Sequence, residues 1–380
     1  MASFSLYAPD NVILGRGCFD NAAVKIGSFG KNILIFKSRS APGTEHLVND
    51  LTKIEKSVMT VNAEKEPTAS ALSDALEVAR KYKPDCIVSL GGGSAIDLGK
   101  AVAGLYNNPI LFEILINPKM VDNYEIDGVL PFIAIPTTAG TGAEATKNAV
   151  ISVPSLGIKK SIRHNALMPN LAIIDPALTD NMPRNLTLAT GLDAVTQLTE
   201  SYLSRKSNSL TQLICASHIE SSLMALKNLM RGGSYRARDI MCNASYASGL
   251  SLANSGLGVI HGIASVIGVR GAPHGAICGR LLSPGLKVNE LVMRNRGLEM
   301  ERMDRVRTWI ANAFNVQSSE AFSALDHFVN SNGLPRLKDM SICKNQISDI
   351  AASAKNASST KSNPVTLEHE EVSEILRLAF

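Results

Sequence analysis

The sequence predicts an α/β domain followed by an all-helical domain, and three observations support this. Short apolar segments alternate with amphipathic helical patterns through the first ~180 residues. After Pro183 the strand-like segments give way to helical periodicity. A chain of 380 residues also exceeds the size of one compact core. We therefore expect an α/β domain over residues 1–182 and a helical domain over residues 183–380.

Each predicted element follows from its local pattern. Strands alternating with helices predict a parallel sheet covered on both faces. From Thr187 onward apolar residues recur at intervals of three and four, as in residues 210–226, and Gly- or Pro-containing breaks separate the segments. The expected strands are residues 33–36, 58–61, 86–90, 132–135 and 171–174, and the expected helices of the first domain are residues 45–54, 70–81 and from 94 to about 105.

Composition excludes several classes of protein. Hydrophobic residues make up 45% and charged residues 19%, which argues against long disorder, and a net charge of +4 gives no general attraction to nucleic acid or anionic membranes. The six cysteines are scattered singly, mostly in apolar settings, as expected for a reducing compartment. The N-terminal sequence has no secretory or transit pattern. We expect a cytoplasmic protein with a small-molecule partner, no nucleic acid and no membrane.

Two loops at the ends of predicted strands suit a nucleotide. Gly91-Gly92-Gly93-Ser94 lies between a buried strand and a helix, where backbone N–H groups and the helix dipole can hold a pyrophosphate. A tight turn capped by Ser94 is an equally good interpretation of this segment alone. The loop 136–144 contains three threonines and two glycines, and by itself it is better explained as a helix-capping loop. Together the two loops favour nucleotide binding.

A carboxylate and two imidazoles form a candidate metal set. Asp193 and Gln197 are four residues apart in a predicted helix and share a face, while His261 and His274 flank a Gly-rich break. Such donors suit Zn²⁺ or Fe²⁺. Spacing alone is weak support, because the two pairs are far apart in the chain. We assign no role to four other histidines, which are His46, His218, His327 and His369.

Taken together, these motifs resemble those of the iron-containing (group III) alcohol dehydrogenase family. The similarity runs in order along essentially the whole chain. It rests on residues 91–100, 135–144, 175–178, 190–197, 256–261 and 273–275.

The resemblance implies a dehydroquinate-synthase-like fold, an α/β nucleotide domain with a helical metal domain, and hydride exchange between NAD(P) and an alcohol or aldehyde in a cleft between them. Homo-oligomers are common in the family. By matching positions, it implies that the metal, Fe or Zn, is held by Asp193, Gln197, His261 and His274, with Asp193, His261 and His274 carrying catalysis. It implies cofactor contacts from Gly92, Gly93, Ser94, Asp97, Thr137, Thr138, Thr141, Lys159 and Leu178.

The chain departs from the family pattern at the metal. Gln197 stands where the family has a histidine, and an amide oxygen is a poorer ligand than imidazole. Ser265 stands where many members have a further histidine. Two alternatives follow. One is a metal-independent reductase, like the family's maleylacetate-reductase branch, that binds an acidic carbonyl substrate through His261, His274 and Arg270 or Lys160. The other is a non-catalytic nucleotide-binding protein.

The residues just after the first buried strand, 33–36, bear on whether the cofactor is NADP or NAD. NAD-preferring members tend to carry an Asp just after this strand, and here Ser38 occupies the matching position between Lys37 and Arg39. Without the carboxylate, a 2′-phosphate meets no repulsion and Lys37 or Arg39 can pair with it, which favours NADP(H). A solvated basic loop is the simpler interpretation of the same residues.

Overall fold

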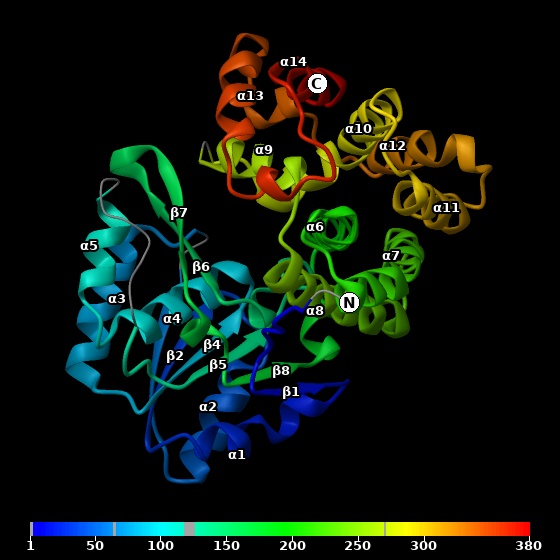
Figure 1. Cartoon of the computed structure of the whole chain (residues 1–380). Helices are drawn as coiled ribbons and strands as arrows, with labels where there is room; N and C mark the ends of the chain where they lie inside the picture. Colours follow the sequence, from blue (N-terminus) through cyan, green and yellow to red (C-terminus); the bar gives the residue numbers. More distant parts are fainter. Residues whose placement is uncertain (1–2, 64–65, 118–125, 270) are drawn as a thin grey trace. The chain divides into compact units, whose positions relative to one another are not determined.

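The computed structural model describes residues 3–63, 66–117, 126–269 and 271–380, and within it the chain divides into two compact units (Figure 1). One unit comprises Tyr7–Thr138 and Gly142–Asn181. The other comprises Met182–Phe380 together with Ala139–Thr141 and the N-terminal residues through Leu6. The first contains the strands and the second is helical, in agreement with the predicted fold class.

The α/β unit is built on a six-stranded parallel sheet with the strand order β1-β8-β5-β4-β2-β3. Central strands such as β4 are buried on both faces, as their apolar sequence predicts. All five predicted strands are present. The sheet strands are β1 (Asn11–Leu14), β2 (Asn32–Ser38), β3 (Ser57–Ala63), β4 (Cys86–Gly91), β5 (Phe132–Pro136) and β8 (Leu171–Ile174).

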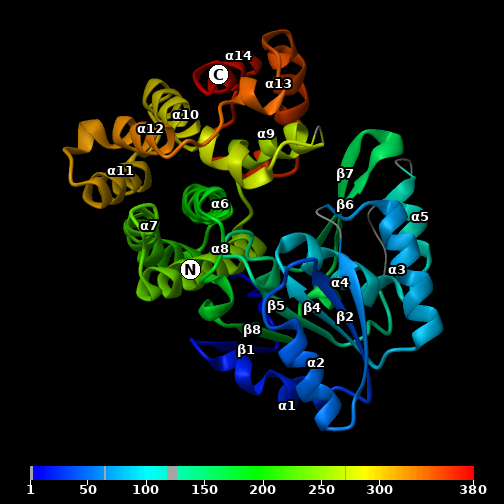
Figure 2. The same cartoon turned by 180° about the vertical axis from the view of Figure 1, so that it is seen from behind.

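Helices cover both faces of this sheet (Figures 1 and 2). Apolar side chains of α1 (Ala22–Gly27) and α2 (Thr44–Lys53) pack on one face with Ile33, Val88 and Ile133. Those of α3 (Ala69–Tyr82) and α4 (Gly93–Leu105) pack on the other face with Phe36 and Phe132. Alternate residues of each strand thus supply two separate cores. The remaining helix of this unit is α5 (Ile110–Ile116).

An antiparallel hairpin that the sequence analysis did not predict follows β5. Its strands are β6 (Asn148–Val153) and β7 (Ile158–Arg163), paired in register from Asn148–Arg163 to Val153–Ile158. Gly157 occupies the left-handed region at φ +62 in the connecting turn. Ala149, Ile151 and Val153 of β6 contribute to the same core as α3 and α4.

The helical unit surrounds α6 (Arg184–Leu203), which packs against α7 (Ser209–Leu229), α8 (Tyr235–Ser255) and α10 (His274–Asn295). Most of α6 is buried, so its two carboxylates, Asp193 and Glu200, lie in the interior. In the part of the chain described, no single helix is long and apolar enough to span a membrane, and α8 with α9 meets that test only as a pair bent by 101°. The other helices are α9 (Val259–Gly268), α11 (Glu301–Phe314), α12 (Ala321–Ser331), α13 (Ile347–Lys355) and α14 (His369–Leu378).

Candidate functional site

The glycine loop lies at the carboxyl end of β4, next to the ends of β2 and β5. The chain moves outward from β2 to β3 and then returns to the other side of β2 at β4, so the strand order changes direction between these neighbours. A Cβ on Gly91 would lie 2.3 Å from Ser38 Oγ, and one on Gly92 would lie 3.2 Å from the Thr138 methyl group. Glycine is therefore required where these loops meet. Crevices at such a change of direction are where open α/β sheets bind ligands.

This loop opens into the first turn of α4. Gly92 is the N-cap with an extended backbone, and Gly93 and Ser94 begin the helix. The Gly92 N–H lies 3.3 Å from Ser38 Oγ, which accepts its hydrogen bond. Thr137 N–H donates to the carbonyl of Gly91 at 2.9 Å and so joins the two loops. The sequence-predicted Gly92, Gly93, Ser94, Thr137, Thr138 and Ser38 therefore come together at one edge of the sheet.

The buried Lys100 holds in place the loop 136–144, here called the threonine loop, and the residues that follow it. The ammonium group of Lys100 donates to the carbonyl oxygens of Ala143, Thr146 and Asn148 at 2.7, 2.6 and 3.0 Å, and it lies 3.1 Å from the Thr146 hydroxyl. Burial lowers the pKa of Lys100 to about 8 against the opposing effect of Asp97. Burial also raises the pKa of Glu144 to about 7. These buried groups support the loop 136–144 from inside the α/β unit.

Other sequence-predicted cofactor residues already have partners within the α/β unit. An Asp97 carboxylate oxygen accepts the Val150 N–H at 3.2 Å, and burial raises the pKa of Asp97 to about 6. The Lys159 ammonium lies 2.8 Å from Glu66 Oε1. Leu178 packs in the core beneath the sheet with 9% of its surface exposed. Arg39 is exposed beside Ser38, and Arg270 lies outside the described residues.

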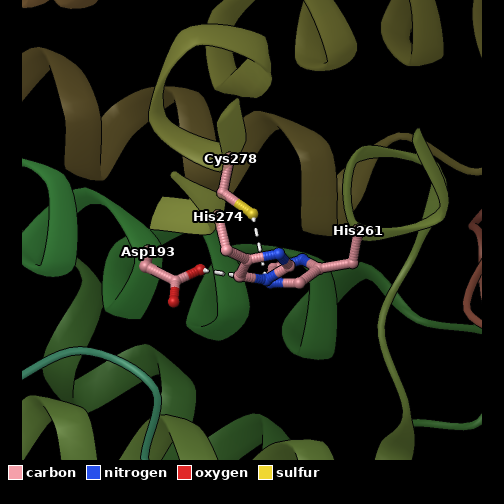
Figure 3. Close-up of side chains that lie close together, drawn as sticks. All are labelled: Asp193, His261, His274 and Cys278. Carbon is pink, nitrogen blue, oxygen red and sulfur yellow. Dashed lines mark hydrogen bonds and ion pairs between the residues drawn. The ribbon is translucent and has the colours of Figure 1, made fainter. Parts of the chain in front are cut away.

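The predicted metal residues meet in the interior of the helical unit. Asp193 comes from the middle of α6, His261 from the first turn of α9, and His274 is the first residue of α10. Their side chains point toward one another, together with Cys278 of α10 (Figure 3). One donor atom from each of the four residues lies within 4.8 Å of every other. Asp193, His261 and His274, which are distant from one another in sequence, therefore form one cluster with Cys278.

Close helix packing brings His274 to this point. A Cβ on Gly275 would lie 2.6 Å from the carbonyl oxygen of Ala189 and 3.3 Å from Asp193 Cβ, so glycine lets α10 begin directly against α6. His274 Nε2 then lies 3.9 Å from Asp193 Oδ1, and His261 Nε2 lies 3.4 Å from the same oxygen. His274 keeps 40% of its side chain exposed, while His261 and Asp193 are almost fully buried.

The electrostatics of the cluster favour a carboxylate anion beside two imidazoles and a thiol. Burial acts to raise the pKa of Asp193, but His274 and His261 hold it below its ordinary value. Burial acts to lower the pKa of His261, but Cys278, Asp193 and Glu200 raise it well above the ordinary range. Burial raises the pKa of the Cys278 thiol to about 12.

Two donor atoms of the cluster lack hydrogen-bond partners. In the described part of the chain, Asp193 Oδ1 and His261 Nε2 are buried side-chain atoms without one. Unsatisfied buried polar atoms are costly, and a bound ion is one accepted reason for them. A carboxylate oxygen, imidazole nitrogens and a sulfur also match the donor set of a borderline divalent ion. The residues therefore fit a metal.

Gln197, expected among the ligands, is engaged elsewhere. It is 3% exposed, and its Oε1 lies 3.0 Å from the Ser248 hydroxyl, which donates to it. The same hydroxyl lies 2.7 Å from the carbonyl oxygen of Ser245. The amide oxygen, the only atom of Gln197 suited to a metal, is thus turned to a hydrogen-bonding neighbour on α8.

Cys278 and Glu200 are functional candidates that the sequence patterns do not single out. Those patterns indicate cysteines that are mainly small buried hydrophobic residues, whereas Cys278 Sγ lies 3.6 Å from His274 Nε2. The spacing of Cys278, four residues after His274 in a helix, was the available signal. Glu200 Oε2 lies 2.6 Å from His261 Nδ1. Its position seven residues after Asp193 placed both side chains on one helical face, but its partner is 61 residues away in the sequence.

Comparison with known proteins gives a consistent result along the chain. The family model for iron-containing alcohol dehydrogenase matches residues 9–176, and the model for the C-terminal part of that family matches residues 187–380. The chain is 31% identical to alcohol dehydrogenase 4 of Schizosaccharomyces pombe, over 99% of this chain and 89% of that protein. It is 25% identical to the NAD-dependent methanol dehydrogenase of Bacillus methanolicus, over 99% and 100%. The solved structure of an alcohol dehydrogenase from Oenococcus oeni superimposes with a TM-score of 0.88 at 25% identity, covering all of both chains.

Proposed function

The chain belongs to the iron-containing alcohol dehydrogenase family, and on that premise we propose which of its residues bind the metal and the dinucleotide. It is an NAD(P)-dependent oxidoreductase that acts on CH–OH groups. The reaction balances as aldehyde plus NAD(P)H plus a proton giving alcohol plus NAD(P)⁺. Small alcohols and aldehydes are the substrate class.

One observation carries the assignment of the metal site. Asp193, His261 and His274 start from three different helices and converge, with two of their buried donor atoms left without hydrogen-bond partners. A metal-independent reductase would not need these three residues to converge. In a protein interior that binds no ion, Asp193 Oδ1 and His261 Nε2 would normally each have a hydrogen-bond partner. We therefore favour a metal-dependent enzyme in which these three residues are ligands.

When bound, a divalent ion supplies a Lewis acid that polarises the substrate oxygen and favours charge on it in the transition state. The side chains have separate tasks. Asp193 provides the negative charge that keeps a cation in a buried place, and Glu200 fixes the orientation of the His261 ring. His274, the most exposed of the three, would hold the ion at the solvent-accessible part of the cluster.

The α/β unit holds the dinucleotide, whose nicotinamide supplies or accepts the hydride. We assign the pyrophosphate to the N–H groups at the start of α4, around Gly93 and Ser94, where the helix dipole favours an anion. Thr137 and Thr138 lie beside this loop and are suited to line the dinucleotide. Lys100 acts through the threonine loop as a positioning residue.

We further propose a preference for NADP(H). The Ser38 hydroxyl accepts from Gly92 and places no charge at the end of β2, while Arg39 is exposed next to it. A 2′-phosphate at this place would meet a guanidinium and no carboxylate on β2. The B. methanolicus relative is NAD-dependent, so the two cofactors must be compared directly.

The test is oxidation of NADPH and of NADH by purified protein with a panel of aldehydes and keto acids. Each assay is run as purified, after chelation, and after addition of Zn²⁺ or Fe²⁺. We expect aldehyde reduction that chelation abolishes and a divalent ion restores, with NADPH the better donor. Full activity in metal-free protein would contradict metal dependence. Nucleotide binding without turnover on any carbonyl compound would contradict the enzymatic function itself.

A further inference from the structure

Cys278 stands where a fourth metal ligand belongs. It follows His274 by one turn of α10, so both side chains lie on one face of the helix. Its sulfur is buried, lies 3.6 Å from His274 Nε2, and belongs to the four donors within 4.8 Å of one another (Figure 3). The other described cysteines are not part of this cluster.

The spacing of the donors matches shared coordination. Donor atoms bound ~2.0–2.3 Å from one tetrahedral ion lie roughly 3.3–3.7 Å apart. His261 Nε2 and Asp193 Oδ1 are 3.4 Å apart, and Cys278 Sγ and His274 Nε2 are 3.6 Å apart. His274 Nε2 and Asp193 Oδ1, at 3.9 Å, are slightly farther. The cluster is therefore close to the geometry of a ligand sphere before any ion is added.

Gln197 and Cys278 differ strongly as ligands. An amide oxygen is neutral and hard, and that of Gln197 accepts a hydrogen bond from Ser248. A thiolate is negatively charged and soft, and coordination to a cation deprotonates a thiol outright. The chain thus has a weak donor on α6 at the position where its family places a histidine, and a strong donor on α10 beside the same carboxylate.

We propose that Cys278 is the fourth metal ligand of this protein, in place of Gln197, and that the resulting Asp193–His261–His274–Cys278 site selects Zn²⁺ over Fe²⁺. The proposal rests on the proposed function for the presence of a metal, and adds the ligand and the ion. On binding, the ion displaces the thiol proton to solvent. Tetrahedral sites that mix nitrogen and sulfur donors are typical of zinc, while sulfur is a minor ligand of mononuclear Fe²⁺ in carboxylate–histidine sites.

The direct test is the absorption spectrum of protein loaded with Co²⁺, a spectroscopic substitute for Zn²⁺. A cobalt–thiolate bond gives a charge-transfer band in the near ultraviolet that oxygen and nitrogen ligands do not give. We expect this band in the wild type and in the control variant Cys215→Ser, which alters a buried cysteine of α7 outside the cluster. We expect its loss in Cys278→Ser. A wild-type Co²⁺ complex without the band overturns the proposal.

Metal affinity provides a second, independent measurement. Chelator competition should give a Zn²⁺ affinity weakened by more than about 100-fold in Cys278→Ser, since loss of an outer-shell partner alone costs ~10–100-fold. Circular dichroism of the metal-free variant checks that it is folded. An affinity within threefold of the wild type overturns the proposal.

The double variant Gln197→His/Cys278→Ser tests whether positions 197 and 278 serve one ion. It creates the donor set of Asp and three His that the family resemblance implies, so we expect it to bind Zn²⁺ far more tightly than Cys278→Ser. We also expect its Zn²⁺-to-Fe²⁺ affinity ratio to fall roughly tenfold or more below the wild-type ratio, because imidazole discriminates less between these ions. An unchanged ratio would contradict the claim that sulfur sets the selectivity.

Failure of this inference and failure of the proposed function are distinguishable. If the enzyme reduces aldehydes in a metal-dependent manner but Co²⁺ shows no thiolate band, Cys278 is not a ligand and the function stands. If the band is present but no carbonyl substrate is turned over, the site assignment stands and the dehydrogenase function is wrong.

Discussion

The carboxylate of Glu200 and the imidazole of His261 form a buried pair, with Glu200 Oε2 2.6 Å from His261 Nδ1. The same carboxylate accepts the backbone N–H groups of Ile260 and His261 at 2.7 and 3.3 Å, so it also caps the N-terminus of α9. A Cβ on Gly258 would lie 2.6 Å from Glu200 Oε1, so this approach requires glycine. Because Nδ1 is occupied, Nε2 is the nitrogen that faces Asp193.

Glu200→Gln should weaken metal binding while leaving the ligands in place. The amide keeps one acceptor but loses the charge that orients and polarises the imidazole, and such outer-shell changes cost ~10–100-fold in metal affinity. Chelator competition with Zn²⁺ measures the effect. The matched control is Glu220→Gln, on α7, whose carboxylate accepts an exposed hydrogen bond from Asn312. Equal affinities for the two variants would refute the positioning role of Glu200.

Metal removal should lower the thermal stability of the wild type. A ligand that binds only the folded state stabilises it by about 2.7 kcal/mol when its free concentration is 100 times Kd. The apparent melting temperature should therefore fall on chelation and rise with added Zn²⁺. Asp193→Ala removes the only carboxylate of the four-donor cluster and should abolish both this dependence and turnover. Asp349→Ala, an exposed site on α13, should retain both. Persistent metal-dependent turnover in Asp193→Ala would exclude Asp193 as a required metal ligand.

Much of the fold follows from local sequence patterns. The five predicted strands and the helices at 45–54, 70–81 and 94–105 are present with ends shifted by a few residues, because apolar periodicity and Gly or Pro breaks are local signals. The hairpin β6–β7 was missed. Its segment 158–163 carries three basic residues and little apolar alternation, and β7 is held mainly by pairing with β6. The residues of β7 alone therefore do not indicate a strand, because its pairing with β6 cannot be recognised from the composition of β7.

The part of the site that could be predicted from the sequence consists of residues whose chemical type is itself distinctive. Asp193, His261 and His274 are chemically distinctive, and the motifs around them resemble a known family. Cys278 has the same residue type as several cysteines that are simply buried, such as Cys86 and Cys215, so only its neighbours in space distinguish it. Glu200 likewise acquires its role from a helix that begins 59 residues later.

Arg39→Ala should reduce the preference for NADPH. If the guanidinium pairs with a 2′-phosphate, its loss should raise the KM for NADPH roughly tenfold and leave the KM for NADH nearly unchanged. Steady-state kinetics with both cofactors and one aldehyde give the comparison. Lys53→Ala is a suitable control, because its ammonium pairs on the surface of α2 with Asp50. Equal changes in both KM values would show that Arg39 does not contact the 2′-phosphate.

Glu144 gives a prediction about pH because its carboxyl group is buried within the α/β unit. It is 2% exposed, and burial raises its pKa from 4.5 to about 7. The folded protein therefore holds this proton more tightly than the unfolded chain does. Linkage requires that this group's contribution to stability be fully present below pH 4.5 and be lost as pH rises through 7.

Glu144→Gln should remove that loss, because the amide resembles the protonated acid and cannot ionise. The Glu144 pKa differs between the unfolded and folded states as 4.5 against about 7. At ~1.36 kcal/mol per unit of pKa, this difference changes the free energy of unfolding by about 3 kcal/mol across the pH range. Chemical denaturation of metal-free wild type and variant at pH 4.5, 6 and 8 measures it, and the difference between the two proteins cancels the other titrating groups. We expect the variant to gain stability relative to the wild type as pH rises. A difference that stays constant with pH would mean that Glu144 ionises near its ordinary pKa despite its burial.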